Sequence, residues 1–191
     1  MTEKIFPSNR LELGPFDSSE VDLPAGYLDF GAIRLVPEPE VGIRLEVEEA
    51  TGRVLALTLE SAGTTLQVSV FAASKHEGVW GDVLEQLAGS IESSGGSVTP
   101  YLGQLGPGLD ARVVQPDGQL RDTRFIGVDG PRWFVRGSIT GNALADLVSA
   151  TEIEDIFRSL VIHRGDSPMP PKEPLEIVVP AGIITPPRPG L

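Results

Sequence analysis

The stretch RDTRFIGVDGPRWFVRGSIT, residues 121–140, decides how the second half of the chain folds. Two runs of alternating apolar and polar residues flank Asp129-Gly130-Pro131, which is typical of a tight turn. The pattern therefore predicts a β-hairpin. With a three-residue loop, Phe125 lies opposite Val135 and Arg124 lies opposite Arg136.

This register places two arginines directly across from each other in a chain of net charge −12. Like charges at such positions destabilise a sheet, so we expect a bound anion, a partner surface or a carboxylate beside them. Neighbouring Trp133 and Phe134 point to opposite faces, which predicts an exposed aromatic side chain of the kind that forms interface hot spots. The candidate anion- or partner-binding residues are Arg112, Arg124, Arg136, Trp133 and Phe134. The alternative is that the arginines pair with Asp110, Asp122 or the acidic N-terminal arm.

Alternating residues also predict the other strands. In the first half they cover residues 28–35, 43–47, 54–59 and 65–72, and in the second half 97–103, 109–115, 122–128 and 132–140. The glycine-containing breaks between them are short, which favours two antiparallel meanders. The second half carries five arginines against four aspartates between residues 101 and 140, so its charge is nearly balanced.

Two segments have helical spacing instead. Trp80, Val83, Leu84, Leu87 and Ile91 form one helix face that ends at Gly95-Gly96. A second helix is predicted over residues 152–162, where Thr151 and Glu154 have the spacing of a capping box. Amphipathic helices need a sheet to bury their apolar faces. The sequence thus predicts an α+β fold: a twisted antiparallel sheet of about seven or eight strands, packed by two helices.

We divide the chain into an N-terminal arm (1–26), a single α+β domain (27–165) and a proline-rich C-terminal tail (166–191). The tail holds 8 of the 17 prolines, which disfavour helix and central strand. Its apolar insert, Leu175–Val179, is expected to dock as an edge strand or in a groove. The alternative is an extended, polyproline-like tail.

Composition excludes several kinds of site. There is no cysteine, so disulfides, thiol nucleophiles and cysteine-ligated metals are excluded. The two histidines, His76 and His163, have no metal-site spacing, and no phosphate-binding glycine motif occurs. We therefore expect no metal and no cofactor. The acidic run of Glu46, Glu48 and Glu49 is interpreted as a solvated strand face.

Location and partners follow from the same composition. No apolar run is long enough to span a membrane and no secretory signal is visible, which predicts a cytoplasmic protein without a membrane partner. The chain has 27 acidic and 15 basic residues. This excess of acidic residues disfavours nucleic-acid binding, because phosphates would repel the chain.

Four segments carry a resemblance: GPFDSSE (14–20), GVWGDVLEQLAGSI (78–91), DTRFIGVDGPRWFVRG (122–137) and EIEDIFRSLVIHRG (152–165). From about Gly14 to Pro174 the chain resembles an uncharacterised actinobacterial domain-of-unknown-function family, which brings no activity, site residue or cofactor. The order of strands and helices is also similar to the Mog1/PsbP-like sandwich. That resemblance implies a mostly non-catalytic fold that builds protein-binding or accessory subunits.

The functional expectation is a non-catalytic module that binds a protein partner or assembles with itself. It depends on the arginine and aromatic hairpin and on the extended C-terminal segment. The alternative is a small-molecule or anion-binding protein, or an enzyme, that uses an arginine-lined pocket.

Overall fold

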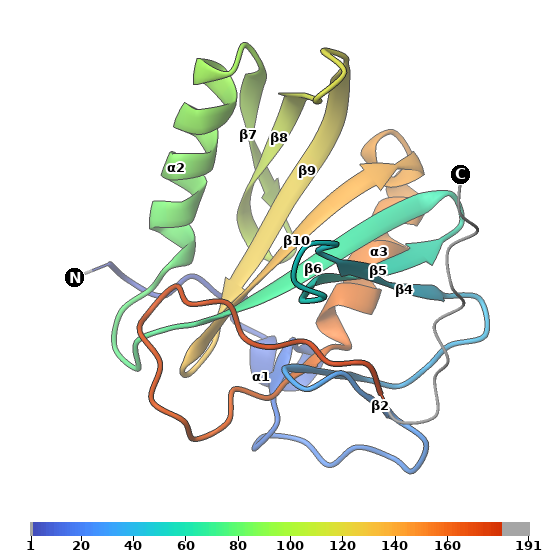
Figure 1. Cartoon of the computed structure of the whole chain (residues 1–191), viewed down its shortest axis with the longest axis vertical. Coiled ribbons are helices and arrows are strands. Elements are labelled where there is room, and N and C mark those ends of the chain that lie inside the picture. The colour runs from blue at the N-terminus through green and yellow to red at the C-terminus, as the bar shows by residue number, and fades with distance from the viewer. Residues whose placement is uncertain (1, 181–191) are drawn as a thin grey trace.

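The computed structural model describes residues 2–180 and has an α+β fold (Figure 1). Its helices are α1 (Arg10–Leu13), α2 (Trp80–Ser93) and α3 (Leu147–Arg158), with a 3₁₀ turn at Asn142–Leu144. The strands form a seven-stranded antiparallel sheet and a four-stranded mixed sheet. The predicted fold class is confirmed, with a second sheet that the sequence did not indicate.

The large sheet has the strand order β4-β5-β6-β10-β9-β8-β7. Its strands are β4 (Gly42–Val47), β5 (Val54–Ser61), β6 (Thr64–Ala72), β7 (Ser97–Gly103), β8 (Gly106–Val114), β9 (Leu120–Asp129) and β10 (Trp133–Gly141). They comprise the second predicted meander and three of the four strands predicted for the first, joined where β6 pairs with β10. Gly106-Pro107-Gly108, predicted as a break between strands, instead begins β8, because the chain already turns at Gln104 and Leu105.

The two long helices lie on opposite faces of this sheet. Trp80 of α2 packs where Gly127 has no side chain, and a Cβ at Gly127 would lie 2.6 Å from the indole ring. On the other face Phe157 of α3 packs beside Gly137, whose added Cβ would lie 3.1 Å from the ring. Because α2 contacts β7, β8 and β9 whereas α3 contacts β6, each helix covers only part of its face (Figure 1).

The small sheet has the order β1-β11-β3-β2. It consists of β1 (Phe16–Asp17), β2 (Leu28–Asp29), β3 (Ile33–Leu35) and β11 (Val161–Ile162), with β1 and β11 parallel. The prediction of one strand over residues 28–35 was wrong, since β2 and β3 pair antiparallel. The chain reverses because the Asp29 carboxylate accepts a hydrogen bond from the amide of Gly31, which has φ +78°.

Helix α3 begins five residues before the predicted start. Asp146 caps it by accepting a 2.8 Å hydrogen bond from the Ser149 amide. The predicted capping box was wrong: Thr151 lies inside the helix, and Glu154 is buried and accepts from the Tyr101 hydroxyl at 2.9 Å. The start of α3 overlaps residues 143–148, for which the sequence also allows a turn of helix, but Leu147 is 81% exposed and breaks the apolar periodicity there.

The hairpin forms, but its predicted register was wrong. Arg124 lies opposite Ile139, and Arg136 lies opposite Gly127. The shift is an odd number of residues, so the two arginines lie on opposite faces of the sheet. The register moves because Asp129 remains in β9 and pairs with Phe134, instead of entering the loop.

Asp129 is 1% exposed and joins three parts of the chain. Its carboxylate accepts hydrogen bonds from the amides of Val79 and Trp80, at 2.9 and 3.2 Å. It also accepts from the Ile5 amide at 2.9 Å, and the Asp129 amide donates to the Ile5 carbonyl. Since Val79 at the N-cap position of α2 has no polar side chain, Asp129 supplies the cap from the hairpin.

The segment 172–178 packs on the body of the molecule. The Leu175 amide donates to the Val70 carbonyl on β6, and the Val178 amide donates to the Phe30 carbonyl beside the small sheet. Leu175 and Ile177 are buried, at 6% and 4% exposure. The segment therefore connects the end of β6 to the small sheet, while residues 181–191 of the predicted tail lie outside the described residues.

We expect Asp129→Ala to lower the free energy of unfolding by about 2–4 kcal/mol, because it removes a helix cap and leaves buried amides without an acceptor. Urea denaturation followed by circular dichroism measures the change. Asp117→Ala is the matched control, since Asp117 is an exposed turn aspartate that accepts from Gln119. Equal losses in the two variants would contradict the assigned role of Asp129.

Ile177→Ala is expected to destabilise the protein by about 2–5 kcal/mol, the usual cost of a cavity at a buried isoleucine. The control is Val179→Ala, because Val179 is 45% exposed. The melting temperature should fall by several degrees only in the first variant. If both variants have the same melting temperature as the wild-type protein, the segment is not docked in solution.

Candidate functional site

The five candidate residues occupy three separate places. Arg112 and Arg124 lie on the face of the large sheet that carries α3, as their pairing with Asp122 and Ile139 shows. Phe134 and Arg136 lie on the face that carries α2, whereas Trp133 points into the core. The structure therefore does not bring the predicted set together.

The two arginines on the α3 side are already paired. Arg124 donates to both oxygens of Asp110, at 2.6 and 3.0 Å, and its guanidinium lies 3.9 Å from the centroid of the Tyr101 ring. The hydrogen bonds to Asp110 raise the pKa of Arg124. Arg112 pairs with Asp122 at 3.0 Å. Internal pairing, one of the two alternatives, thus accounts for both residues.

The prediction of an exposed aromatic residue in the hairpin was wrong. Trp133 is fully buried, and its indole N–H donates to Asp17 at 2.8 Å. Phe134 is 2% exposed and stacks on Trp80 and Phe71, with ring centroids 5.5 and 5.6 Å apart. Both side chains are buried because the two faces of β10 are covered by different elements.

A groove of about 260 Å³, the α2 groove, lies between α2 and strands β6 and β10. Phe71 and Phe134 line it from the sheet, and Val83 and Leu87 line it from the helix. Its polar lining comes from Gln86, Ser90, Arg136 and Lys172. The groove thus combines apolar walls with two cations and no carboxylate.

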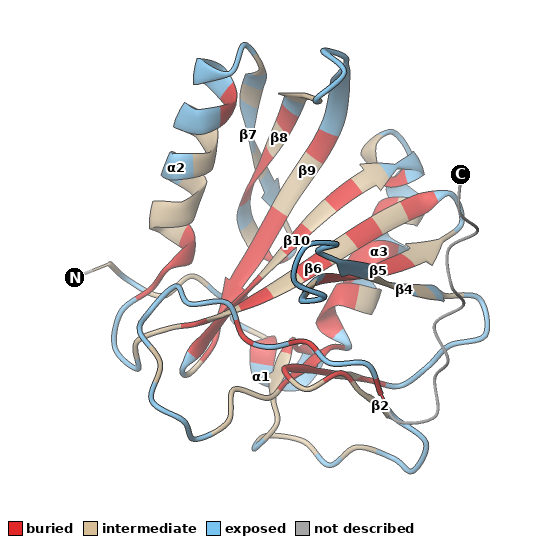
Figure 2. Cartoon of the chain, viewed as in Figure 1, coloured by how far each residue is buried: buried red, intermediate tan, exposed pale blue. Residues whose placement is uncertain are grey.

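The groove exists because α2 buries its apolar face fully only at its ends. Trp80 and Ile91 are buried, whereas the residues between them are half-buried or exposed (Figure 2). Trp80 fits over Gly127, and Ile91 packs on Leu109 and Ala111 of β8. The middle of the helix packs against the same clusters less completely, so Val83 and Leu87 stay half-buried beside the sheet.

Arg136 is the central charge of the groove. Its strand neighbours are Gly127 and Ser69, which offer no carboxylate. Within residues 2–180 it forms no ion pair, and its guanidinium lies over the Phe71 ring, 5.6 Å from the centroid. Burial lowers the pKa of Arg136, although an arginine side chain stays protonated in proteins. Among the described residues, Arg136 is thus a partly desolvated cation without a counter-ion.

The second cation, Lys172, comes from the C-terminal segment. Its ammonium group is 3.8 Å from the Asp82 carboxylate, and both side chains are about half exposed. An exposed pair of this length is weak, because solvent screens it. Lys172 therefore remains able to approach an anion bound in the groove.

Sequence reasoning identified Arg136 and Phe134 but missed the other parts of the groove. One signal was present: Phe71 falls at the polar position of β6, in register with Thr65, Gln67 and Ser69. An apolar residue at such a position indicates a contact on the second face. Lys172 had no sequence signal, because only the docking of residues 172–178 brings it to β6.

In the described part of the chain, no group of three or more histidine, aspartate or glutamate side chains is arranged to hold a metal ion. None of the described helices is long and apolar enough to cross a membrane. The chemistry of the α2 groove is therefore that of its cations, amide, hydroxyl and apolar walls.

Comparison with curated proteins and with solved structures finds no match for this chain. A family model described as "Protein of unknown function (DUF3710)" matches residues 14–185. The matched region contains both helices that pack on the large sheet and every residue that lines the α2 groove. The match confirms the resemblance to a domain-of-unknown-function family, and the chain belongs to the DUF3710 family of proteins of unknown function.

Proposed function

We propose that this chain is a binding protein whose α2 groove takes a small amphipathic anion, with a carboxylate or phosphate at Arg136 and an apolar body against α2. Arg136 is the observation that carries the proposal. A guanidinium that is partly removed from water and has no carboxylate beside it is electrostatically incomplete. A bound anion completes it through charge-assisted hydrogen bonds.

The walls of the groove support an apolar body on the ligand. Phe71, stacked on the buried Phe134, presents ring surface, and Val83 and Leu87 present aliphatic surface on the facing helix. Apolar area removed from water contributes roughly 25 cal/mol per Å² to binding. Most ligand sites have this composition, mainly apolar with a few polar groups that fix orientation.

The arginine hairpin itself is a weaker candidate for a protein-binding surface. Trp133 and Phe134 of the hairpin are buried, and Arg124 is neutralised by Asp110 on the neighbouring strand β8. The volume of the α2 groove, about 260 Å³, suits a small ligand better than a helix or strand of a partner. We therefore favour the alternative of an arginine-lined pocket over a protein interface at the hairpin.

The test uses 8-anilinonaphthalene-1-sulfonate, an aromatic anion whose fluorescence rises in apolar sites, and decanoate as the competing carboxylate. Wild-type protein should bind the dye, and decanoate should displace it. Arg136→Gln should weaken both ligands about tenfold or more, because a hydrogen-bonded charge contributes about 1.5–3 kcal/mol. Decanol, which keeps the apolar chain without the charge, should displace the dye poorly.

Arg112→Gln is the matched control, since Arg112 is an arginine of the same sheet that is paired and exposed. It should bind the dye and decanoate as the wild type does. Circular dichroism and melting temperature establish that both variants are folded. Equal affinity of Arg136→Gln and wild type for decanoate would refute the proposal.

A further inference from the structure

The two edges of the large sheet differ in how they are protected. At one edge, β7 carries Pro100, which lacks an amide donor, and α2 packs against the strand. At the other edge, β4 has no proline within Gly42–Val47, and its register with β5 shifts between Glu46 and Val47. Among residues 2–180, nothing pairs with the outer side of β4. Such an edge presents free amide and carbonyl groups to another strand.

The sequence of β4 is complementary to itself about Leu45. If β4 meets the β4 of a second copy in antiparallel orientation with Leu45 at the centre, Arg44 lies opposite Glu46 of that copy. In the same register Ile43 lies opposite Val47. Opposite charges and apolar side chains at facing positions both stabilise a strand pair. Each favourable contact occurs twice, because a two-fold axis repeats it.

The side chains near this edge are available for such contacts. Val47 is 46% exposed, and Leu55 on the adjacent strand is 52% exposed. The Arg44 side chain is 65% exposed and already pairs with Glu60 of β5. The Glu46 carboxylate accepts from Gln67 of β6. A second copy therefore extends the polar network on the sheet face that carries Arg44 and Glu46. On the opposite face of β4 it covers the apolar side chain of Val47.

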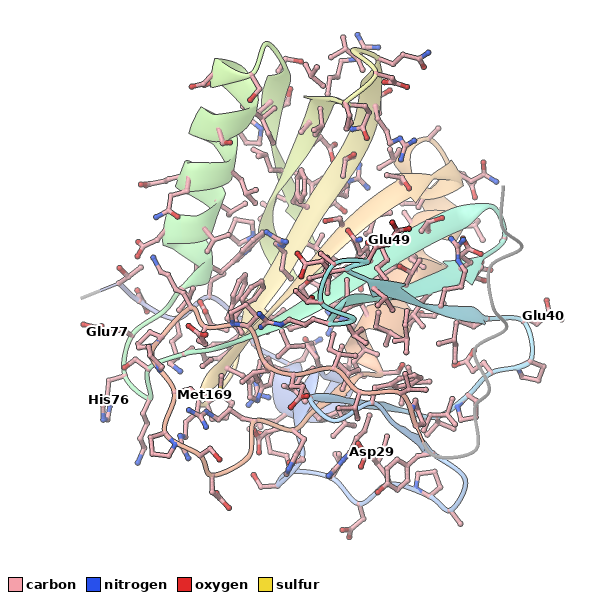
Figure 3. The ribbon with its side chains drawn as sticks, in the orientation of Figure 1. Asp29, Glu40, Glu49, His76, Glu77 and Met169 are labelled. Carbon is pink, nitrogen blue, oxygen red and sulfur yellow. The ribbon has the colours of Figure 1, made fainter. Side chains whose placement is uncertain are left out.

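We propose that two copies of this chain associate through antiparallel pairing of their β4 strands, which joins the two large sheets into one. The α2 groove lies on β6 and β10, away from this edge, so the two proposals are independent. The glutamates that flank β4 oppose association: Glu38, Glu40 and Glu48, of which Glu40 projects from the molecule (Figure 3). Salt screens both this repulsion and the facing Arg44–Glu46 pairs, so the test holds the salt concentration at about 0.15 M.

The test measures the sedimentation of charge-swapped full-length chains over a range of protein concentration in about 0.15 M salt. Wild type should sediment as a dimer at high concentration. R44E places two glutamates opposite two glutamates, and E46R places two arginines opposite two arginines, so each variant alone should be monomeric. An equimolar mixture of R44E and E46R should recover the dimer, because each strand then faces its opposite charge.

R112E is the matched control, since it reverses an equally exposed arginine on β8, away from the edge. It should dimerise as the wild type does, and circular dichroism should show that all variants are folded. Two results would overturn the proposal. One is a wild-type protein that stays monomeric at every concentration, and the other is a dimer that neither R44E nor E46R weakens.

Discussion

The buried carboxylate of Asp129 is the contact on which the arrangement of this molecule depends. It accepts amide hydrogen bonds from the N-terminal arm and from the start of α2. A buried carboxylate has to keep such donors, because no water replaces them. Asp129 is therefore held in β9 rather than in the turn, and this position fixes the register of the β9–β10 hairpin.

The register in turn decides which charges are compensated. It puts Arg124 on the α3 face, beside Asp110, and Arg136 on the α2 face, beside Gly127 and Ser69. The cap also sets the start of α2 at Trp80, whose ring needs the space above Gly127. The helix is thereby held over β7, β8 and β9, and the surface of β6 and β10 that it leaves open becomes the α2 groove.

The sequence predicted the parts of this fold whose signal is periodic. Alternation located the strands of both meanders, and helical spacing located α2. Prediction from periodicity failed where aspartate side chains accept hydrogen bonds from the backbone. Asp29 turns the chain at Gly31, and Asp146 caps α3 before the predicted start of that helix. Asp129 was recognised only as a turn residue, because its partners at Ile5 and Val79 are distant in sequence. Arg136 was identified because it lies in the periodic hairpin. Lys172 was not, because its neighbours on β6 are distant in sequence.

Within residues 2–180, Arg136 is a cation of the α2 groove that no carboxylate neutralises, and we propose that an anion binds there. The most direct measurement is an NMR titration of the isotope-labelled protein with decanoate, which follows backbone amides and arginine Nε–Hε groups together. The account predicts that the largest shifts occur at the Nε–Hε of Arg136 and at the amides of Val83 and Leu87. Shifts centred instead on Arg112 and Arg124, or no saturable shifts at all, would contradict it.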